Sequence, residues 1–248
     1  SDGEMHIMGK RAGQNTCTFQ IATSGDHIGI GSYPNWDILS VDYPMSNYLN
    51  NWMHIAFTYD GNLMSVYIDG NLIEQVSNVQ LGAKSTAPLK FGGVGYGWSY
   101  GGLLDEIKIW DRALSGSEIE SSLNYNYDDL GDGLVGDWRI NEGPESQYLI
   151  DYSGNQNHGA IYGGEWELNE LDSDPSIDYC LKFDGDDDYV FLGNPDILDF
   201  GSNDFTVSSW FKTNEEKRQW IMSNYLSFGS YPMWMFGVPH NNNPGTLG

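Results

Sequence analysis

The middle of the chain alternates apolar and polar residues. Between residues 52 and 60, apolar side chains occupy every second position. Neighbouring side chains of a strand point to opposite faces, so this period predicts a β-strand with one side toward a core. A second apolar run covers 63–69. Each run ends in an Asp-Gly dipeptide, Asp60-Gly61 or Asp69-Gly70, which tolerates the positive φ of a tight turn, so the two runs predict a β-meander.

Similar short patterns recur along most of the chain and are separated by Gly, Asn and Ser clusters that interrupt any helical period. They predict an all-β architecture. The remaining predicted strands cover 5–9, 17–22, 27–32, 37–40, 89–92, 103–110, 134–140, 181–190, 204–211, 220–224 and 231–236.

One short helix is predicted over 115–124. Ser115 is followed three residues later by Glu118, which is the spacing of a capping box. In this motif each side chain accepts a hydrogen bond from a free backbone N–H of the first turn.

Three consecutive motifs then suggest a family. They are Trp-x-His-x-Ala-x-Thr-Tyr-Asp-Gly from Trp52, Val-Tyr-Ile-Asp-Gly from Val66, and Gly-x-Leu-Asp-Glu-Ile-x-Ile-Trp-x-Arg-Ala-Leu-Ser from Gly102. In this order they resemble the laminin-G-like domains of the concanavalin-A-like lectin and glucanase superfamily. The resemblance implies an antiparallel β-sandwich, or jelly roll.

The family order is rotated in this chain. Residues 134–159, 181–190 and 204–211 resemble the opening strands of the same family, although they follow the closing motifs. Residues 124–133 lack apolar periodicity and contain several turn formers. We therefore expect 1–123 to be the C-terminal part of a first laminin-G-like domain, 124–133 a linker, and 134–248 the N-terminal part of a second domain.

An internal comparison favours this interpretation. Trp220–Asn224 aligns with His6–Lys10, and at the same offset Tyr231–Phe236 aligns with Cys17–Ala22. The pattern predicts an excerpt from a tandem array, whose neighbouring repeats would be partners of this chain. The alternative is one circularly permuted sandwich over 1–213.

Composition narrows the classes of partner. The chain has 35 acidic and 11 basic residues in 248 positions, a formal charge of −24. This charge repels phosphate backbones and anionic lipid, so nucleic-acid binding is disfavoured. The sequence has no apolar run long enough to cross a bilayer, so no membrane insertion is expected. Cations are the favoured small partners.

The cysteine content and the absence of glycosylation motifs bear on location. Cys17 and Cys180 form no disulfide framework, and we expect them not to be bonded to each other. No Asn-x-Ser/Thr acceptor occurs, which disfavours a eukaryotic secreted glycoprotein. Together with the resemblance, this predicts an extracellular or cell-surface location, with a bacterial surface protein favoured.

The resemblance implies a structural calcium site. Calcium takes oxygen ligands, and two stretches offer them. Asp105 and Glu106 are adjacent in a predicted strand, so their side chains should face opposite sides and one of them should be buried. Asp151, Asn155 and Asn157 lie in a turn-rich loop. The alternative, equally weighted, is that Asp105 and Asp151 accept hydrogen bonds from backbone N–H groups in turns.

Two other acidic patterns are weaker evidence for a functional site, one for a calcium loop and one for a glycosidase. Asp184 to Asp188 has the alternation of an EF-hand start, but Tyr189 and Pro195 stand where Gly and Glu are needed, so a charged turn is the better interpretation. Glycosidases of this superfamily carry alternating acids on one strand. Glu165 and Glu167 alternate but lack a flanking strand pattern, so no enzyme is predicted.

Aromatic residues in loops are candidates for sugar stacking. The Gly-rich stretch 92–102 presents Tyr96, Trp98 and Tyr100, and Trp36 raises the same question. The alternative is that such rings, Trp98 above all, fold back onto the sandwich.

These observations predict a non-enzymatic extracellular binding or adhesion module of a repetitive surface protein, which recognises a carbohydrate or an extracellular protein. Two alternatives remain: a ligand-free stalk or filament repeat, and an accessory domain of a glycan-processing enzyme. The fold alone does not choose among them.

Overall fold

The chain is described in a computed structural model that defines residues 27–32, 35–79, 81, 88–92, 99–123, 130–169, 178–198, 200–214, 219–223 and 235–238. The strands are β1 His27–Ser32, β2 Asn35–Asp42, β3 Met53–Tyr59, β4 Met64–Ile68, β5 Asn71–Val76, β6 Leu89–Phe91, β7 Gly101–Trp110, β8 Leu134–Trp138, β9 Tyr148–Leu149, β10 Gly159–Tyr162, β11 Glu165–Leu168, β12 Tyr179–Asp184, β13 Tyr189–Gly193, β14 Phe205–Lys212, β15 Gln219–Ser223 and β16 Met235–Val238. The helix α1 covers Gly116–Ser122, and short 3₁₀ turns cover Met45–Asn47 and Asp196–Leu198.

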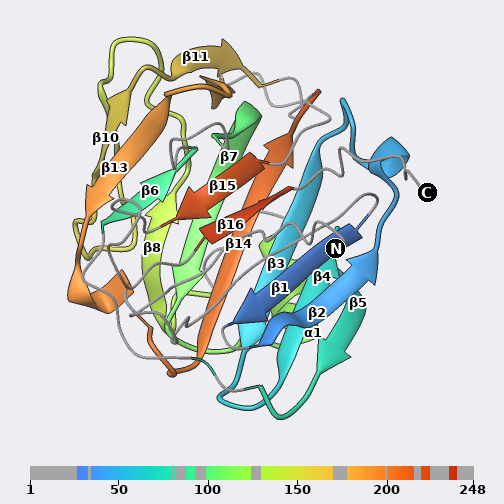
Figure 1. Cartoon of the computed structure of the whole chain (residues 1–248). Helices are drawn as coiled ribbons and strands as arrows, with labels where there is room; N and C mark the ends of the chain where they lie inside the picture. Colours follow the sequence, from blue (N-terminus) through green and yellow to red (C-terminus); the bar gives the residue numbers. More distant parts are fainter. Residues whose placement is uncertain are drawn as a thin grey trace.

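Two antiparallel sheets form a sandwich (Figure 1). The large sheet has the order β11-β12-β7-β14-β3-β4-β5, with β8 also paired to β7. The second sheet has the order β16-β15-β6-β13-β10-β9, and β1 and β2 form a separate pair. The predicted all-β sandwich with one short helix is thus confirmed.

β7 is the central strand of the large sheet. One of its edges pairs with β14 along most of its length. The other edge is shared, because Gly101–Leu104 pair with β12 and Ile107–Trp110 pair with β8. β14 in turn pairs with β3 over seven residues, from Phe205↔Tyr59 to Phe211↔Met53. Strands from both halves of the sequence therefore alternate within one sheet.

This arrangement corrects the expected domain division. The segments 1–123 and 134–248 were predicted to belong to different sandwiches, yet β8, β12 and β14 of the second segment pair with β3 and β7 of the first. The physical reason is complementarity, since the later strands supply the neighbours that β3 and β7 lack on their own edges. The observed arrangement is one sandwich, as in the alternative, but it is not limited to 1–213, because β15 and β16 extend the second sheet beside β6. Whether the chain derives from a tandem array stays a prediction.

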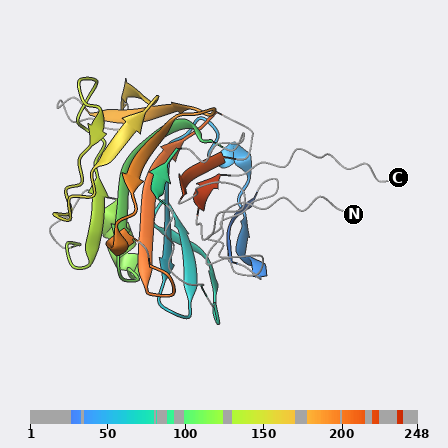
Figure 2. The same cartoon turned by 60° about the vertical axis from the view of Figure 1, so that its left-hand side comes forward.

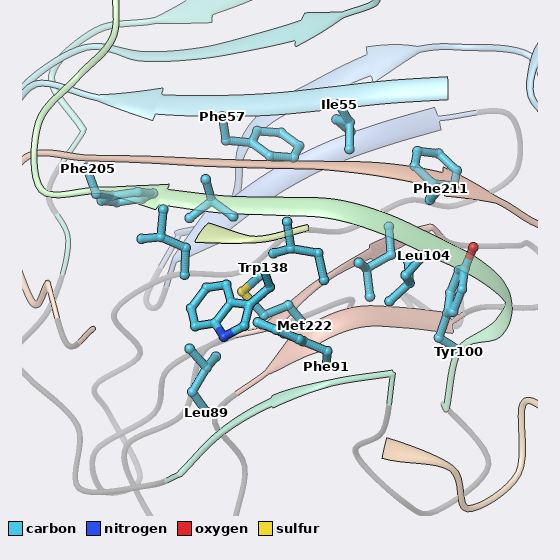
Figure 3. Close-up of a cluster of buried hydrophobic side chains, with 14 of the residues drawn as sticks. Ile55, Phe57, Leu89, Phe91, Tyr100, Leu104, Trp138, Phe205, Phe211 and Met222 are labelled. Carbon is cyan, nitrogen blue, oxygen red and sulfur yellow. The ribbon is translucent and has the colours of Figure 1, made fainter. Parts of the chain in front are cut away.

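The core lies between the two sheets (Figure 3). Ile55, Phe57, Leu104 and Phe211 come from the large sheet, and Phe91 and Met222 face them from the other; all are almost completely buried. The rings of Phe91 and Trp138 meet edge to face at 4.9 Å. The alternate positions predicted to face the core of β3 do so, from Met53 to Tyr59.

The opposite face of the large sheet is also buried, which the alternation in β3 did not indicate. A smaller apolar cluster covers it, formed by Ala56, Tyr67, Trp110, Leu114, Ile119 and Leu130. Figure 2 shows α1 on this side of the large sheet and β15 with β16 on the other. The predicted capping box is confirmed: the Ser115 side chain accepts from the Glu118 N–H, and Glu118 accepts from the Ser115 N–H.

Most predicted strands are present within one or two residues of the expected bounds. The strands expected at 5–9 and 17–22 lie outside the described residues. β5, β9, β10 and β11 were not predicted. β5 and β11 are the two edge strands of the large sheet, and their side chains are mostly exposed. Cys180 is a free, buried thiol, as predicted, and Cys17 lies outside the described part. No described helix is long and apolar enough to span a membrane.

Candidate functional site

A β-bulge in β7 organises the polar interior of the large sheet. Trp210 of β14 pairs with Asp105, whereas Ser208 pairs with Lys108, so β7 carries one extra residue here. Glu106 adopts φ of +47°, a left-handed conformation that costs energy for a residue other than glycine. Bulges of this kind re-aim side chains.

The bulge corrects the expectation that Asp105 and Glu106 face opposite sides. Leu104 and Ile107 both belong to the apolar core, and the two carboxylates lie between them. Both acids are buried, with exposed fractions of 1% and 6%. In a regular strand only one residue would separate two core positions, so the extra residue lets both carboxylates avoid the core.

Glu106 forms an ion pair with Lys108. The amine of Lys108 also lies 3.8 Å from Oδ1 of Asp137, which is the cross-strand partner of Lys108 on β8. All three side chains are less than a tenth exposed. We call Glu106, Lys108 and Asp137 the buried triad. Arg139 donates from Nε to the other oxygen of Asp137 at 3.0 Å.

Asp105 lies beside the triad but contacts different groups. Its Oδ1 accepts from the Glu106 N–H at 2.8 Å, and its Oδ2 accepts from the Asn169 amide. Burial raises the pKa of Asp105 well above its usual value, and the neighbouring charge of Glu106 raises it further. The surroundings of Asp105 therefore disfavour its charged form relative to an exposed aspartate.

His54 lies on the same buried face. Its ring meets Trp210 edge to face at 5.4 Å, and Nδ1 makes no hydrogen bond. Burial lowers the pKa of His54 to about 3, with a further contribution from the positive charge of Lys108. The imidazole is therefore neutral at physiological pH.

The Asp151 loop lies next to β8. Both oxygens of Asp151 accept backbone hydrogen bonds, Oδ1 from Asp137 and Ser153 and Oδ2 from Asn157, all at 2.9–3.0 Å. The side-chain amides of Asn155 and Asn157 donate to the carbonyl of Val135. This loop therefore holds the end of β8 in place through hydrogen bonds.

The predicted calcium ligands do not fit that ion in this arrangement. Asp105, Glu106 and Asp151 do not gather into one cluster of carboxylates among the described residues. Their oxygens already accept from Asn169, Lys108 or backbone N–H groups, and Asn155 and Asn157 present donors to a carbonyl. Calcium needs several unprotonated oxygens aimed at one point.

The carboxylates that do gather belong to the turn after β12. Ligand atoms of Asp184, Asp187 and Asp188 lie within 4.8 Å of one another. Asp188 accepts from the Asp184 N–H, and Asp184 accepts from the Asp186 N–H, each at 2.8 Å. These bonds are those of a charged hairpin turn, the interpretation favoured from the sequence.

The aromatic residues predicted to stack on a sugar lie in different parts of the chain, and only some of them are described by the structure. Tyr100 is not available for stacking on a ligand: it is completely buried, and its hydroxyl donates toward the carbonyls of Leu103 and Lys212. It anchors the start of β7 to the end of β14. Tyr96 and Trp98 lie outside the described residues, and Trp36 lies in β2.

A cavity of about 320 Å³ opens beside the start of β7 and is lined by both polar and apolar residues, which come from four strands, from Asn50 before β3 and from the chain that follows β14. We call it the β7–β12 cavity. Its lining is Asn50, Gly101, Gly102, Leu103, Glu167, Lys182, Phe183, Asp184, Lys212, Thr213 and Asn214. Both signs of charge and two amides meet there, which suits a ligand rich in hydroxyl groups.

The lining of this cavity was missed from the sequence. Asp184 was interpreted only as part of a charged turn, and nothing in the sequence singled out Lys182 or Lys212. The buried triad was missed too, although a signal was present: Lys108 stands between two isoleucines in a strand expected to be buried, where a lysine needs a partner.

The two facing antiparallel sheets form a β-sandwich of the jelly-roll type that the motifs predict. Comparison with protein families agrees. Residues 1–120 match the laminin-G-like family model described as the concanavalin A-like lectin/glucanases superfamily, which confirms the resemblance seen in the motifs. Neither curated proteins nor solved structures gave a match. The class is that of modules that bind carbohydrate or protein.

Proposed function

We propose that this chain is a non-enzymatic extracellular module that binds carbohydrate at the β7–β12 cavity and serves adhesion in a repetitive surface protein. The observation that carries the proposal is the cavity itself. It combines Lys182, Lys212, Asp184 and Asn50, whose donors and acceptors can bond to sugar hydroxyls in several directions.

The arrangement of acids supports binding over hydrolysis. Glycosidases place two carboxyl groups on either side of the bond to be cleaved, one acting as acid and one as base or nucleophile. In the cavity, Glu167 is held in an ion pair with Lys182 at 3.0 Å. Glu106, the acid on the central strand, is engaged by Lys108 within the sheet. Asp184, the other carboxylate of the cavity, accepts from the Asp186 N–H in the charged turn. The cavity therefore offers Asp184 for hydrogen bonding to hydroxyls, while Glu167 and Glu106 are engaged in ion pairs.

A glycan array probed with the intact chain tests the proposal. We expect wild-type protein to bind a subset of glycans, and Lys212→Ala to weaken binding about tenfold, the loss typical of one charge-assisted hydrogen bond. Lys90→Ala is the matched control, because Lys90 lies on β6 of the other sheet. It should leave binding unchanged.

If folded wild-type protein binds no glycan on the array, the proposal of carbohydrate binding is contradicted. If Lys212→Ala binds glycans as well as wild-type protein does, the binding site lies elsewhere on the molecule. In the first case a protein ligand or a ligand-free stalk repeat would be the better account.

A further inference from the structure

We propose that the buried triad is a self-modification site, at which Lys108 and Asp137 join in an intramolecular amide bond with Glu106 as the catalytic residue. The bond would link β7, the last strand of the segment 1–123, to β8, the first strand of the segment 134–248. It would close the two halves of the sandwich covalently.

Proximity is the first argument. Lys108 and Asp137 are direct cross-strand partners, and the amine lies 3.8 Å from the Asp137 carboxylate. A nucleophile and an electrophile held on neighbouring strands of a rigid sheet react as if at very high concentration, with effective molarities of about 10⁵ M or more. A small side-chain adjustment brings the amine into contact with the Asp137 carboxyl carbon.

Burial is the second argument. The exposed fractions of the Lys108, Glu106 and Asp137 side chains are 4%, 7% and 1%. Charges in such a site are costly, and an amide removes two of them while releasing a water molecule to the solvent. Exclusion of water also protects the amide from hydrolysis afterwards.

The third argument is that each step of the chemistry has a group to perform it. Glu106 contacts the Lys108 amine and takes a proton from it. The neutral amine attacks the side-chain carbonyl carbon of Asp137 and forms the C–N bond. Oδ1, which makes no hydrogen bond, receives two protons through Glu106, and its C–O bond breaks so that it leaves as water. Arg139 donates to Oδ2, the oxygen that becomes the amide carbonyl.

The strained bulge is consistent with this role. Glu106 holds a left-handed backbone conformation that positions its carboxylate against Lys108, two residues away on the same strand. Strain of this kind persists where the surrounding structure enforces it, and it concentrates at functional sites.

An ion pair at the surface lacks the burial that favours amide formation in the triad. Lys182 and Glu167 are closer, at 3.0 Å, but their side chains are about half exposed. Solvent competes for both groups there. This pair should not form an amide.

The test is the mass of the intact, folded full-length chain. We expect it to be lower than the sequence mass by one water molecule, and a digest to yield one branched peptide that joins Lys108 to Asp137. Lys108→Arg and Asp137→Ala should restore the full mass. Asp137→Asn should lose one ammonia molecule in place of water, which separates amide formation from dehydration elsewhere.

The catalytic role has its own readout. Glu106→Gln should slow formation of the bond by about 10²–10⁴-fold, the usual contribution of a general acid–base group. The control Lys182→Arg should keep the mass deficit. Wild-type protein at its full sequence mass would overturn the proposal, and so would a deficit that persists in Lys108→Arg. Neither result depends on how well a variant folds.

Discussion

At the scale of single residues, His54 stands out because an ionisable side chain is almost completely buried. A histidine in an alternating strand is usually solvated on one side, yet this one is 2% exposed between Trp210 and Lys108. The folded chain therefore keeps a neutral imidazole where the unfolded chain would bind a proton.

The consequence is a pH-dependent stability. The folded pKa of about 3 lies below the unfolded value of 6.5, so the unfolded state binds more protons between these values and stability falls as the pH falls through this window. Between about pH 7.5 and about pH 5, we expect wild-type protein to lose about 2 kcal/mol more unfolding free energy than His54→Gln. Urea unfolding at the two pH values measures this difference. Equal losses in the two proteins would show that His54 does not contribute.

Asp151 gives a second prediction at this scale. Its two oxygens accept from three backbone N–H groups, so Asp151→Ala leaves buried donors without partners and should lower the unfolding free energy by about 3 kcal/mol. Asp187→Ala removes the same charge from an exposed turn and is the control.

The same variant tests calcium. Because the role assigned to Asp151 needs no ion, the loss should be equal in excess calcium and in EDTA, measured by thermal melting. A wild-type melting temperature that EDTA lowers, together with loss of this difference in Asp151→Ala, would restore the metal interpretation.

At the scale of elements, the predictable features were those governed by local rules. The capping box was visible because Ser115 and Glu118 satisfy each other within one turn. The strand β3 was visible because its two faces differ in residue size and polarity. β11 was not, since an edge strand needs no apolar alternation, and the β7 bulge was not, because it depends on where β12 ends and β8 begins along one edge of β7.

The helix offers a measured test of such local rules. Ser115→Ala removes an acceptor from the first turn of α1 and should lower the unfolding free energy by about 1 kcal/mol. Ser121→Ala, in the last turn, is the matched control and should change it by no more than about 0.5 kcal/mol. Chemical denaturation of the three proteins gives the comparison. Equal effects of the two substitutions would contradict the assigned cap.

The candidate site was harder to predict because it depends on contacts between distant segments of the chain and not on local rules. The residues around the β7–β12 cavity range from Asn50 to Asn214 and come from β7, β11, β12, β14 and two connecting segments, so no motif unites them. Tyr100 was expected at a binding surface because it follows glycines. It is instead a buried link between two strands, since its hydroxyl reaches backbone carbonyls of both.

At the scale of the whole molecule, the structure shows how a chain with the family motifs in rotated order forms one sandwich. The motifs predicted the sandwich but did not decide whether the two segments belong together. Pairing decides it, because β14 occupies the position between β7 and β3 and leaves neither edge of these strands open to a second chain. The internal similarity of 220–236 to 6–22 remains an argument for a repetitive parent protein.

The most direct test of the single permuted sandwich is cleavage between the two segments. A protease site inserted within residues 124–129 of the Lys108→Arg variant would allow the chain to be cut where no amide bond can hold the pieces together. We expect the pieces, 1–123 and 134–248 with their flanks, to elute as one particle under native conditions and to unfold in one cooperative transition. Two separately eluting pieces that each remain folded would contradict the account.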